Sequence, residues 1–158
     1  MSHTILAPEY TKQVFVHKSL KALVKRALPK VRSLKRSLKF NALAVCGHSG
    51  IIVGTVLSYQ TGLPLLVIRK PGESRHDSLH VNGNIPNECR YLIVDDLIST
   101  GSTIRFISNK LKEAATPRGL KAPVLVGILL YYEFYHRTSF QCDSDSELVP
   151  VYNMKGTG

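Results

Sequence analysis

One pattern most constrains what this chain can fold into. From Asn41 onward, short apolar runs alternate with glycine-bearing turns and helical stretches. Apolar runs that predict strands span residues 42–46, 65–69, 91–94 and 124–130, with one more at 147–152. Helices are predicted at 51–60, closed by Gly62, and at 103–115. Strands that alternate with helices form a mostly parallel sheet flanked by helices, so the predicted fold class is α/β.

The length and hydropathy of the chain favour a single domain. With 158 residues, 44% of them hydrophobic, the chain can bury a core. Its longest uncharged runs, 40–68 and 122–132, are interrupted by polar residues, Gly and Pro, so neither reads as a membrane span. The start shows no secretion signal. We therefore expect one cytoplasmic domain over 1–158, with a basic helical segment at 1–40, a core at 41–131 and a tail at 132–158.

The charge is unevenly distributed. Lys and Arg number 21 against 11 Asp and Glu, a formal net charge of +10. Between Tyr10 and Phe40, ten residues are Lys or Arg and none is acidic. A surplus of this size favours an anionic partner, which could be nucleic acid, a membrane surface or a phosphorylated small molecule. The total does not choose among the three.

The basic segment also has helical periodicity. Its apolar residues fall on one face of a helix: Leu20, Leu23, Val24, Leu28, Val31, Leu34 and Leu38. Pro29 is expected to split or kink this helix. Two interpretations remain open, a solvated basic face over a stripe packed on the core, or a surface for nucleic acid or an acidic ligand. The polar face has no interleaved aromatic residues for base stacking.

The sharpest chemical signal follows the predicted strand at 91–94. Asp95 and Asp96 come directly after it, and a loop rich in Gly, Ser and Thr then opens a helix. In parallel sheets, ligands bind beyond the carboxyl ends of the strands. Free backbone N–H groups at a helix start suit a phosphate, with Gly101 where the backbone would crowd the anion. Two adjacent carboxylates suit sugar hydroxyls or a divalent cation carried by the same ligand.

Residues 92–104 resemble the phosphoribosyl pyrophosphate (PRPP) signature of type I phosphoribosyltransferases. The resemblance implies that Asp95 and Asp96 bind the ribose hydroxyls and serve as catalytic and Mg2+-binding residues. It implies that the loop wraps the 5′-phosphate through Ser99, Thr100, Gly101, Ser102 and Thr103.

Two further segments resemble the pyrophosphate-binding parts of the same family. The first follows the strand at 42–46 and consists of Gly47, His48, Ser49 and Gly50. Its glycines allow close approach to an anion, although His48 could equally be a turn residue facing solvent. The second is the basic pair Arg69 and Lys70, which otherwise would be two solvated charges at a strand end.

Residues 71–88 show no periodicity and predict a long loop, a kind of segment that usually has a function. They occupy the place of the family's mobile catalytic loop. Because this stretch has no lysine, it departs from the lysine-rich loop of the orotate enzymes. Arg75, His76 and His80 are the remaining candidates, and the first two are the catalytic candidates along with Lys70.

The resemblance implies an enzyme and its substrates. We expect a Mg2+-dependent phosphoribosyltransferase of nucleotide salvage that joins a nitrogenous base to PRPP, releases pyrophosphate and forms a homodimer. In this family the flanks build a small hood that reads the base, here the N- and C-terminal segments. The alternative is a regulator that senses PRPP and binds nucleic acid through the basic helix, with no membrane partner in either case. Both acids, a full phosphate loop and a basic pair favour catalysis over sensing.

Overall fold

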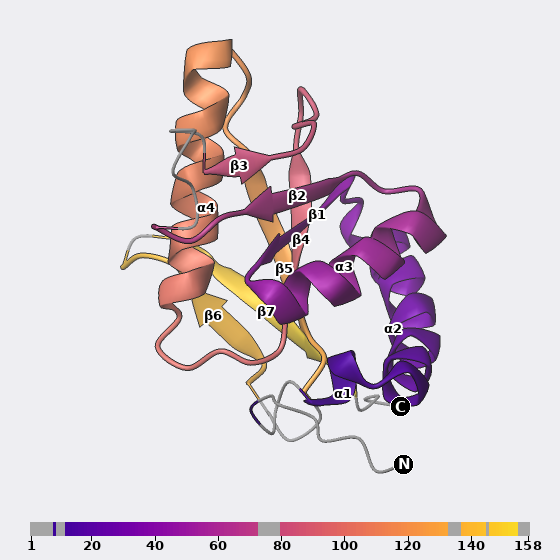
Figure 1. Cartoon of the computed structure of the whole chain (residues 1–158). Coiled ribbons are helices and arrows are strands. Elements are labelled where there is room, and N and C mark those ends of the chain that lie inside the picture. Colours follow the sequence, from indigo (N-terminus) through magenta and orange to yellow (C-terminus); the bar gives the residue numbers. More distant parts are fainter. Residues whose placement is uncertain (1–7, 9–11, 73–79, 133–136, 145, 155–158) are drawn as a thin grey trace.

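The structure is a computed structural model that describes residues 8, 12–72, 80–132, 137–144 and 146–154. A seven-stranded sheet lies at its centre, in the order β3-β2-β1-β4-β5-β7-β6 (Figure 1). The strands are β1 (Ala42–Cys46), β2 (Leu65–Ile68), β3 (Val81–Asn82), β4 (Arg90–Asp95), β5 (Val124–Leu130), β6 (Ser139–Gln141) and β7 (Leu148–Asn153). The five inner strands pair in parallel and the two edge strands pair antiparallel. This arrangement confirms the predicted α/β class with a mostly parallel sheet.

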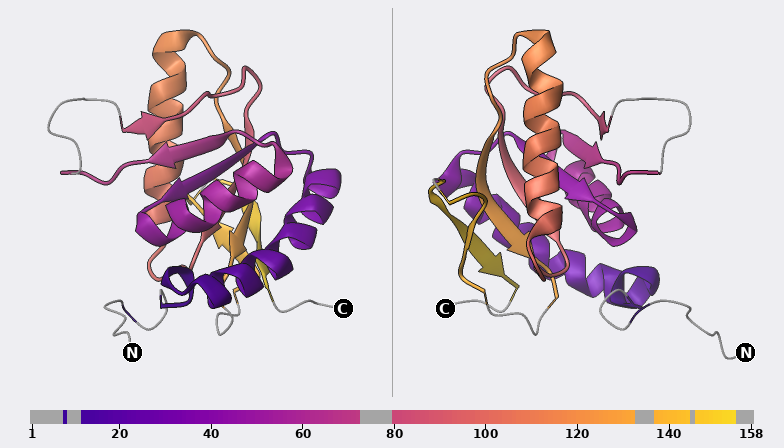
Figure 2. Two further views of the ribbon diagram at one scale, coloured as in Figure 1. Left: turned by 45° about the vertical axis from the view of Figure 1, so that its right-hand side comes forward. Right: turned by 90° about the vertical axis from the view of Figure 1, so that its left-hand side faces the viewer.

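Helices cover both faces of the sheet, as Figure 2 shows. They are α1 (Lys12–Phe15), α2 (His17–Leu38), α3 (His48–Thr61) and α4 (Ser102–Ala115), with a short 3-10 helix at Thr116–Arg118. Alternate residues of β1 serve the two faces, because Ala42 and Ala44 pack with α4 and Leu43 and Val45 pack with α2 and α3. All five β1 residues are buried, as expected for the middle of a parallel sheet.

The predicted helices are found, with earlier starts. The helix expected at 51–60 begins three residues sooner, at His48, and Gly62 ends it in the left-handed conformation with its N–H donating to Ser58 O at 2.9 Å. The helix expected at 103–115 begins at Ser102. Both starts follow a glycine with positive φ, which apolar periodicity does not detect.

The basic segment forms one long helix. Leu23, Ala27, Val31 and Leu34 of α2 are buried in the core. Pro29 does not split α2, which continues through it to Leu38, so the expected split is wrong. Pro29 has no N–H to donate to the Lys25 carbonyl one turn earlier. Because both residues are exposed, water can hydrate that carbonyl instead.

Two segments differ from their predictions. Within 71–88, expected to be a loop, residues 81–82 form the edge strand β3 against β2. In the tail, β7 matches the strand expected at 147–152, whereas β6, which pairs with it, was not expected. Strand β6 has only three residues, too few to show a periodicity. Among the described residues, no helix is long and apolar enough to cross a membrane.

Candidate functional site

A cavity of about 550 Å³ lies where three neighbouring parallel strands end. Cys46 ends β1, Asp95 ends β4, and Lys70 follows β2 by two positions. The cavity is lined by Pro8, Phe15, Cys46, Gly47, His48, Ser49, Lys70 and the ten residues 95–104. Parallel pairing brings segments far apart in sequence to one edge of the sheet, and the volume is in the range of small-molecule sites.

Most of the predicted site residues line this cavity. They are Asp95, Asp96, Lys70, Gly47, His48, Ser49 and the loop residues Ser99, Thr100, Gly101, Ser102 and Thr103. Gly50 and Arg69 are not among the lining residues. Arg75 and His76 lie outside the described residues.

The two adjacent acids are held in different ways. The Asp96 backbone N–H donates to Asp95 Oδ1 at 2.9 Å, and the Leu97 N–H donates to Asp96 Oδ1 at 2.7 Å. Ser49 Oγ donates to Asp96 Oδ2 at 3.4 Å, which ties this carboxylate to the start of α3. Beyond the end of β5, the Tyr131 N–H donates to Asp95 O at 3.0 Å. The backbone of the pair is therefore fixed from β5, and its side chains from the site itself.

Burial separates the electrostatics of the two acids. Asp95 is 7% exposed, and Asp96 is half-buried at the cavity. The pKa of Asp95 is raised from 3.8 to about 8, mainly by burial and next by the charge of Asp96, while Lys70 lowers it. The pair therefore favours a bound cation or hydroxyl donors, which would compensate the charge that burial disfavours.

The segment after the acids forms a loop with a backbone donor, the Gly101 N–H, that is unpaired among the described residues. Gly101 has φ +81° and stands just before α4. Thr100 Oγ1 accepts the Ser102 N–H at 3.3 Å and donates to Ser102 Oγ at 3.1 Å, so the loop is folded on itself. Within the described part of the chain, the Gly101 N–H donates to no other group. An unpaired N–H beside the positive end of a 14-residue helix suits a phosphate.

The opposite side of the cavity is formed by the loop after β1. Gly47 has φ +81° and ψ 165°, a conformation open essentially to glycine alone. A Cβ built on Gly47 would lie 3.8 Å from Lys70 Nζ. The structure thus brings the glycine loop and the lysine to one side of the cavity.

Comparisons with known proteins agree with this geometry, although no family model matches the chain. A hypoxanthine/guanine phosphoribosyltransferase of Methanohalophilus mahii is 39% identical over 40% of this chain and 40% of its own length. An adenine phosphoribosyltransferase of Prochlorococcus marinus subsp. pastoris is 28% identical over 78% of each chain. The crystal structure of adenine phosphoribosyltransferase from Saccharomyces cerevisiae shares the fold, with a TM-score of 0.64, 17% identity, and coverage of 97% of this chain and 88% of that chain.

The chain is similar in sequence and in fold to phosphoribosyltransferases. It spans about two fifths of the length of the Methanohalophilus relative.

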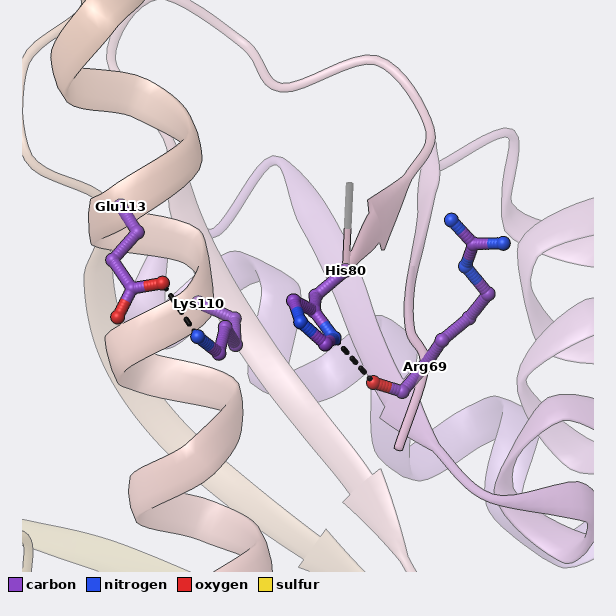
Figure 3. A network of polar contacts seen from close by, with 4 residues as sticks. All are labelled: Arg69, His80, Lys110 and Glu113. Carbon is purple, nitrogen blue, oxygen red and sulfur yellow. Dashed lines mark hydrogen bonds and ion pairs between the residues drawn. The ribbon is translucent and has the colours of Figure 1, made fainter. Parts of the chain in front are cut away.

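Two residues expected to bind pyrophosphate, Gly50 and Arg69, lie beside the cavity rather than in its lining. A Cβ on Gly50 would lie 3.4 Å from Val94 O, so α3 packs against β4 at this position. The Arg69 backbone continues the edge of the sheet, because its N–H donates to His80 O at 2.8 Å. Figure 3 shows the Arg69 guanidinium directed away from His80 and α4.

His80 does not reach the cavity either. Its Nδ1 lies 3.3 Å from Arg69 O, and its ring meets Phe106 of α4 edge-on at 6.0 Å (Figure 3). His80 is thus packed between the sheet edge and α4, away from the cavity lining.

The structure also adds residues that sequence reasoning missed. Phe15 and Pro8 line the cavity from the N-terminal segment, and Phe15 is 52% exposed. Cys46, Leu97, Ile98 and Ile104 supply apolar wall. The sequence shows Phe15 as an aromatic residue next to the basic segment, which could have marked it as a binding residue. Nothing in the sequence places it beside residues 95–104.

The acid pair is compatible with Mg2+. The described residues hold no cluster of three or more His, Cys, Asp or Glu side chains that could cage a metal ion. Magnesium is commonly held by one or two carboxylates together with phosphate oxygens and water. Two adjacent carboxylates fit that pattern, because the same cavity also holds hydrogen-bond donors that can bind a phosphate.

Proposed function

We propose that this chain transfers the phosphoribosyl group of PRPP to a nitrogenous base and releases pyrophosphate. One observation carries the proposal: the acid pair, the loop at 99–103, Gly47 and Lys70 line a single cavity at the ends of three parallel strands. A ligand with a phosphate, a diol and a second anionic group would engage all three. The relatives are named as transferases, so the comparisons do not favour the regulator.

The proposed reaction breaks the bond between C1′ and the pyrophosphate oxygen and forms one between C1′ and a base nitrogen. Positive charge develops on the sugar and negative charge on the leaving group, so catalysis is positioning plus electrostatic stabilisation. The loop at 99–103 would anchor the 5′-phosphate and the acid pair would hold the ribose hydroxyls. Lys70 and the backbone near Gly47 would stabilise the leaving pyrophosphate. When bound at Asp95 and Asp96, Mg2+ would neutralise further charge on pyrophosphate.

We propose a purine as the acceptor base, because the relatives are named as adenine and hypoxanthine/guanine phosphoribosyltransferases. Phe15, half-exposed at the cavity, offers an apolar face for a planar ring. We also expect a homodimer, and sedimentation analysis of the purified chain would test this oligomeric state. The expected location is the cytoplasm.

A pyrophosphate-release assay tests the proposal. Wild-type protein with PRPP and Mg2+ is offered adenine, hypoxanthine, guanine, xanthine, uracil, orotate and nicotinate in turn, and omission of Mg2+ tests the metal. The double variant Asp95→Asn, Asp96→Asn is the control for contaminating activity. We expect release with at least one purine and none with the variant. If none of the bases supports pyrophosphate release, the proposed transferase activity is wrong. If orotate alone supports it, the purine assignment is wrong.

A further inference from the structure

The guanidinium of Arg105 joins two segments that the PRPP signature does not connect. Arg105 lies in the first turn of α4. Its Nη1 donates to the carbonyl of Thr100, in the phosphate loop, at 2.9 Å. Its Nε donates to the carbonyl of Cys142, just past the end of β6, at 2.6 Å. One side chain therefore fastens the phosphate loop to the C-terminal part of the sheet.

Phe140 of β6 packs against the same loop. This ring is 2% exposed, and the centre of the Arg105 guanidinium lies 5.1 Å from its centroid. A Cβ built on Gly101 would come within 2.2 Å of Phe140 Cε2. The glycine at the head of the phosphate loop is thus the one residue type that lets Phe140 reach this position.

The Arg105 bond also determines where a loop donor points. The Thr100 carbonyl and the Gly101 N–H belong to one peptide unit, which is planar, so the two groups point in opposite directions. Because Arg105 holds the carbonyl, the Gly101 N–H is turned away from Arg105. No described residue accepts this N–H, and Gly101 lines the cavity.

We propose that Arg105 is a positioning residue for the 5′-phosphate. It holds the Thr100–Gly101 peptide so that the Gly101 N–H is presented to the phosphate, with Phe140 as the wall behind the loop. This inference rests on the proposed function, because it assumes that the loop binds a phosphate. It assigns to β6, which lies outside residues 92–104, a part in forming the phosphate site. Arg105 itself is not among the residues that line the cavity, so it acts through the loop.

The test compares three variants by calorimetry. Arg105→Gln removes both the guanidinium group and its charge. Arg105→Lys keeps the charge but cannot donate to the Thr100 and Cys142 carbonyls at once. Arg137→Gln is the matched control. The Arg137 guanidinium lies 5.2 Å from the centroid of the same Phe140 ring, and among the described residues it makes no hydrogen bond to the phosphate loop. The ligands are ribose 5-phosphate and pyrophosphate, each measured separately with the folded proteins.

We expect both Arg105 variants to bind ribose 5-phosphate about tenfold more weakly, the scale of one hydrogen bond from a charged group. Pyrophosphate affinity should stay within about twofold, and Arg137→Gln should change neither affinity. Full ribose 5-phosphate affinity in Arg105→Lys would overturn the proposal, because charge alone would then suffice. Equal weakening of both ligands would also overturn it, since that result indicates general loss of structure.

Hydrogen exchange of the free protein separates this inference from the proposed function. Peptides covering residues 99–103 should exchange faster in Arg105→Lys than in wild type, whether or not ribose 5-phosphate binds. If wild type binds no ribose 5-phosphate and no PRPP, the proposed function is wrong, and the exchange rates still decide whether Arg105 holds the loop. Unchanged exchange at 99–103 would contradict the role of Arg105.

Discussion

At the scale of single residues, the acid pair carries the most specific expectation. Asn at both Asp95 and Asp96 removes two charged acceptors, each worth about 1.5–3 kcal/mol in a charge-assisted bond. PRPP affinity should therefore fall by roughly tenfold or more, measured by calorimetry. Circular dichroism should show a folded protein. A folded double variant with unchanged PRPP affinity would show that the acids do not bind the ribose.

The raised pKa of Asp95 predicts a pH dependence of stability. The folded protein holds a proton on Asp95 up to about pH 8, whereas the unfolded chain releases it near 3.8. The unfolded state binds fewer protons across this window, so the contribution of Asp95 to the free energy of unfolding falls as pH rises. Urea unfolding without divalent cations should show wild type losing more stability from pH 5 to pH 8 than Asp95→Asn. Equal losses in the two proteins would contradict the shift.

A residue without a side chain is required at position 101, but for a different reason from the expected one. The sequence suggested crowding by a bound anion, whereas the atoms that a Cβ would meet belong to Phe140 and Arg105. Gly119 is a matched control, because its φ is +65° and nothing lies within 4 Å of its Cβ position. Gly101→Ala should lower Tm clearly more than Gly119→Ala, which suffers backbone strain alone. Equal changes in Tm would contradict the close packing.

At the scale of elements, α3 shows how closely a helix can lie on the sheet. A Cβ on Gly54 would be 2.5 Å from Val45 Cγ1 of β1 and 3.1 Å from Leu65 Cδ1 of β2. Alanine in place of a helical glycine ordinarily stabilises by about 1 kcal/mol. Here overpacking should reverse the sign and destabilise by about 1–3 kcal/mol.

Denaturant unfolding checks the effect of Gly54→Ala. Thr55→Ala, at the next and exposed position of α3, is the control and should change the free energy of unfolding little. A more stable Gly54→Ala protein would mean that α3 does not lie this close to β1.

At the scale of the whole molecule, most of the positive charge lies away from the cavity. Lys70 is the only Lys or Arg among the described residues that line it, so a small phosphorylated substrate does not account for a net charge of +10. The exposed cations instead follow α2, whose apolar face is occupied by the core. Lys18, Lys25, Arg32 and Lys35 are exposed there.

Replacing these four residues by Gln should leave turnover nearly unchanged, because none lines the cavity. We expect feeble duplex binding by wild type at physiological ionic strength, since the polar face of α2 lacks stacking aromatics. Fluorescence anisotropy over a salt series measures it, with a log–log slope of about -0.9 per phosphate contact if binding is present. Tight binding that the Gln variant loses would assign nucleic acid to this helix.

The sequence by itself determined the features that depend on neighbouring residues. The apolar runs at 42–46 and 124–130 match β1 and β5 residue for residue, and Gly62 ends α3 as predicted. A strand that is buried on both faces has a continuous apolar sequence, and a left-handed helix end favours glycine. Both features can therefore be recognised from consecutive residues. The acids and the loop at 95–103 were readable for the same reason, as consecutive residues at one strand end.

Only the tertiary structure decided which distant residues complete the site. Arg69 and Lys70 are neighbours in sequence, yet Lys70 reaches the cavity and Arg69 does not. Phe15 arrives from the N-terminal segment, and Phe140 reaches the phosphate loop through pairing of β6 with β7. These placements result from packing between segments as far apart in sequence as Phe15 and Ile104. No local pattern encodes them, because each side chain's contacts are set by the whole sheet rather than by its sequence neighbours.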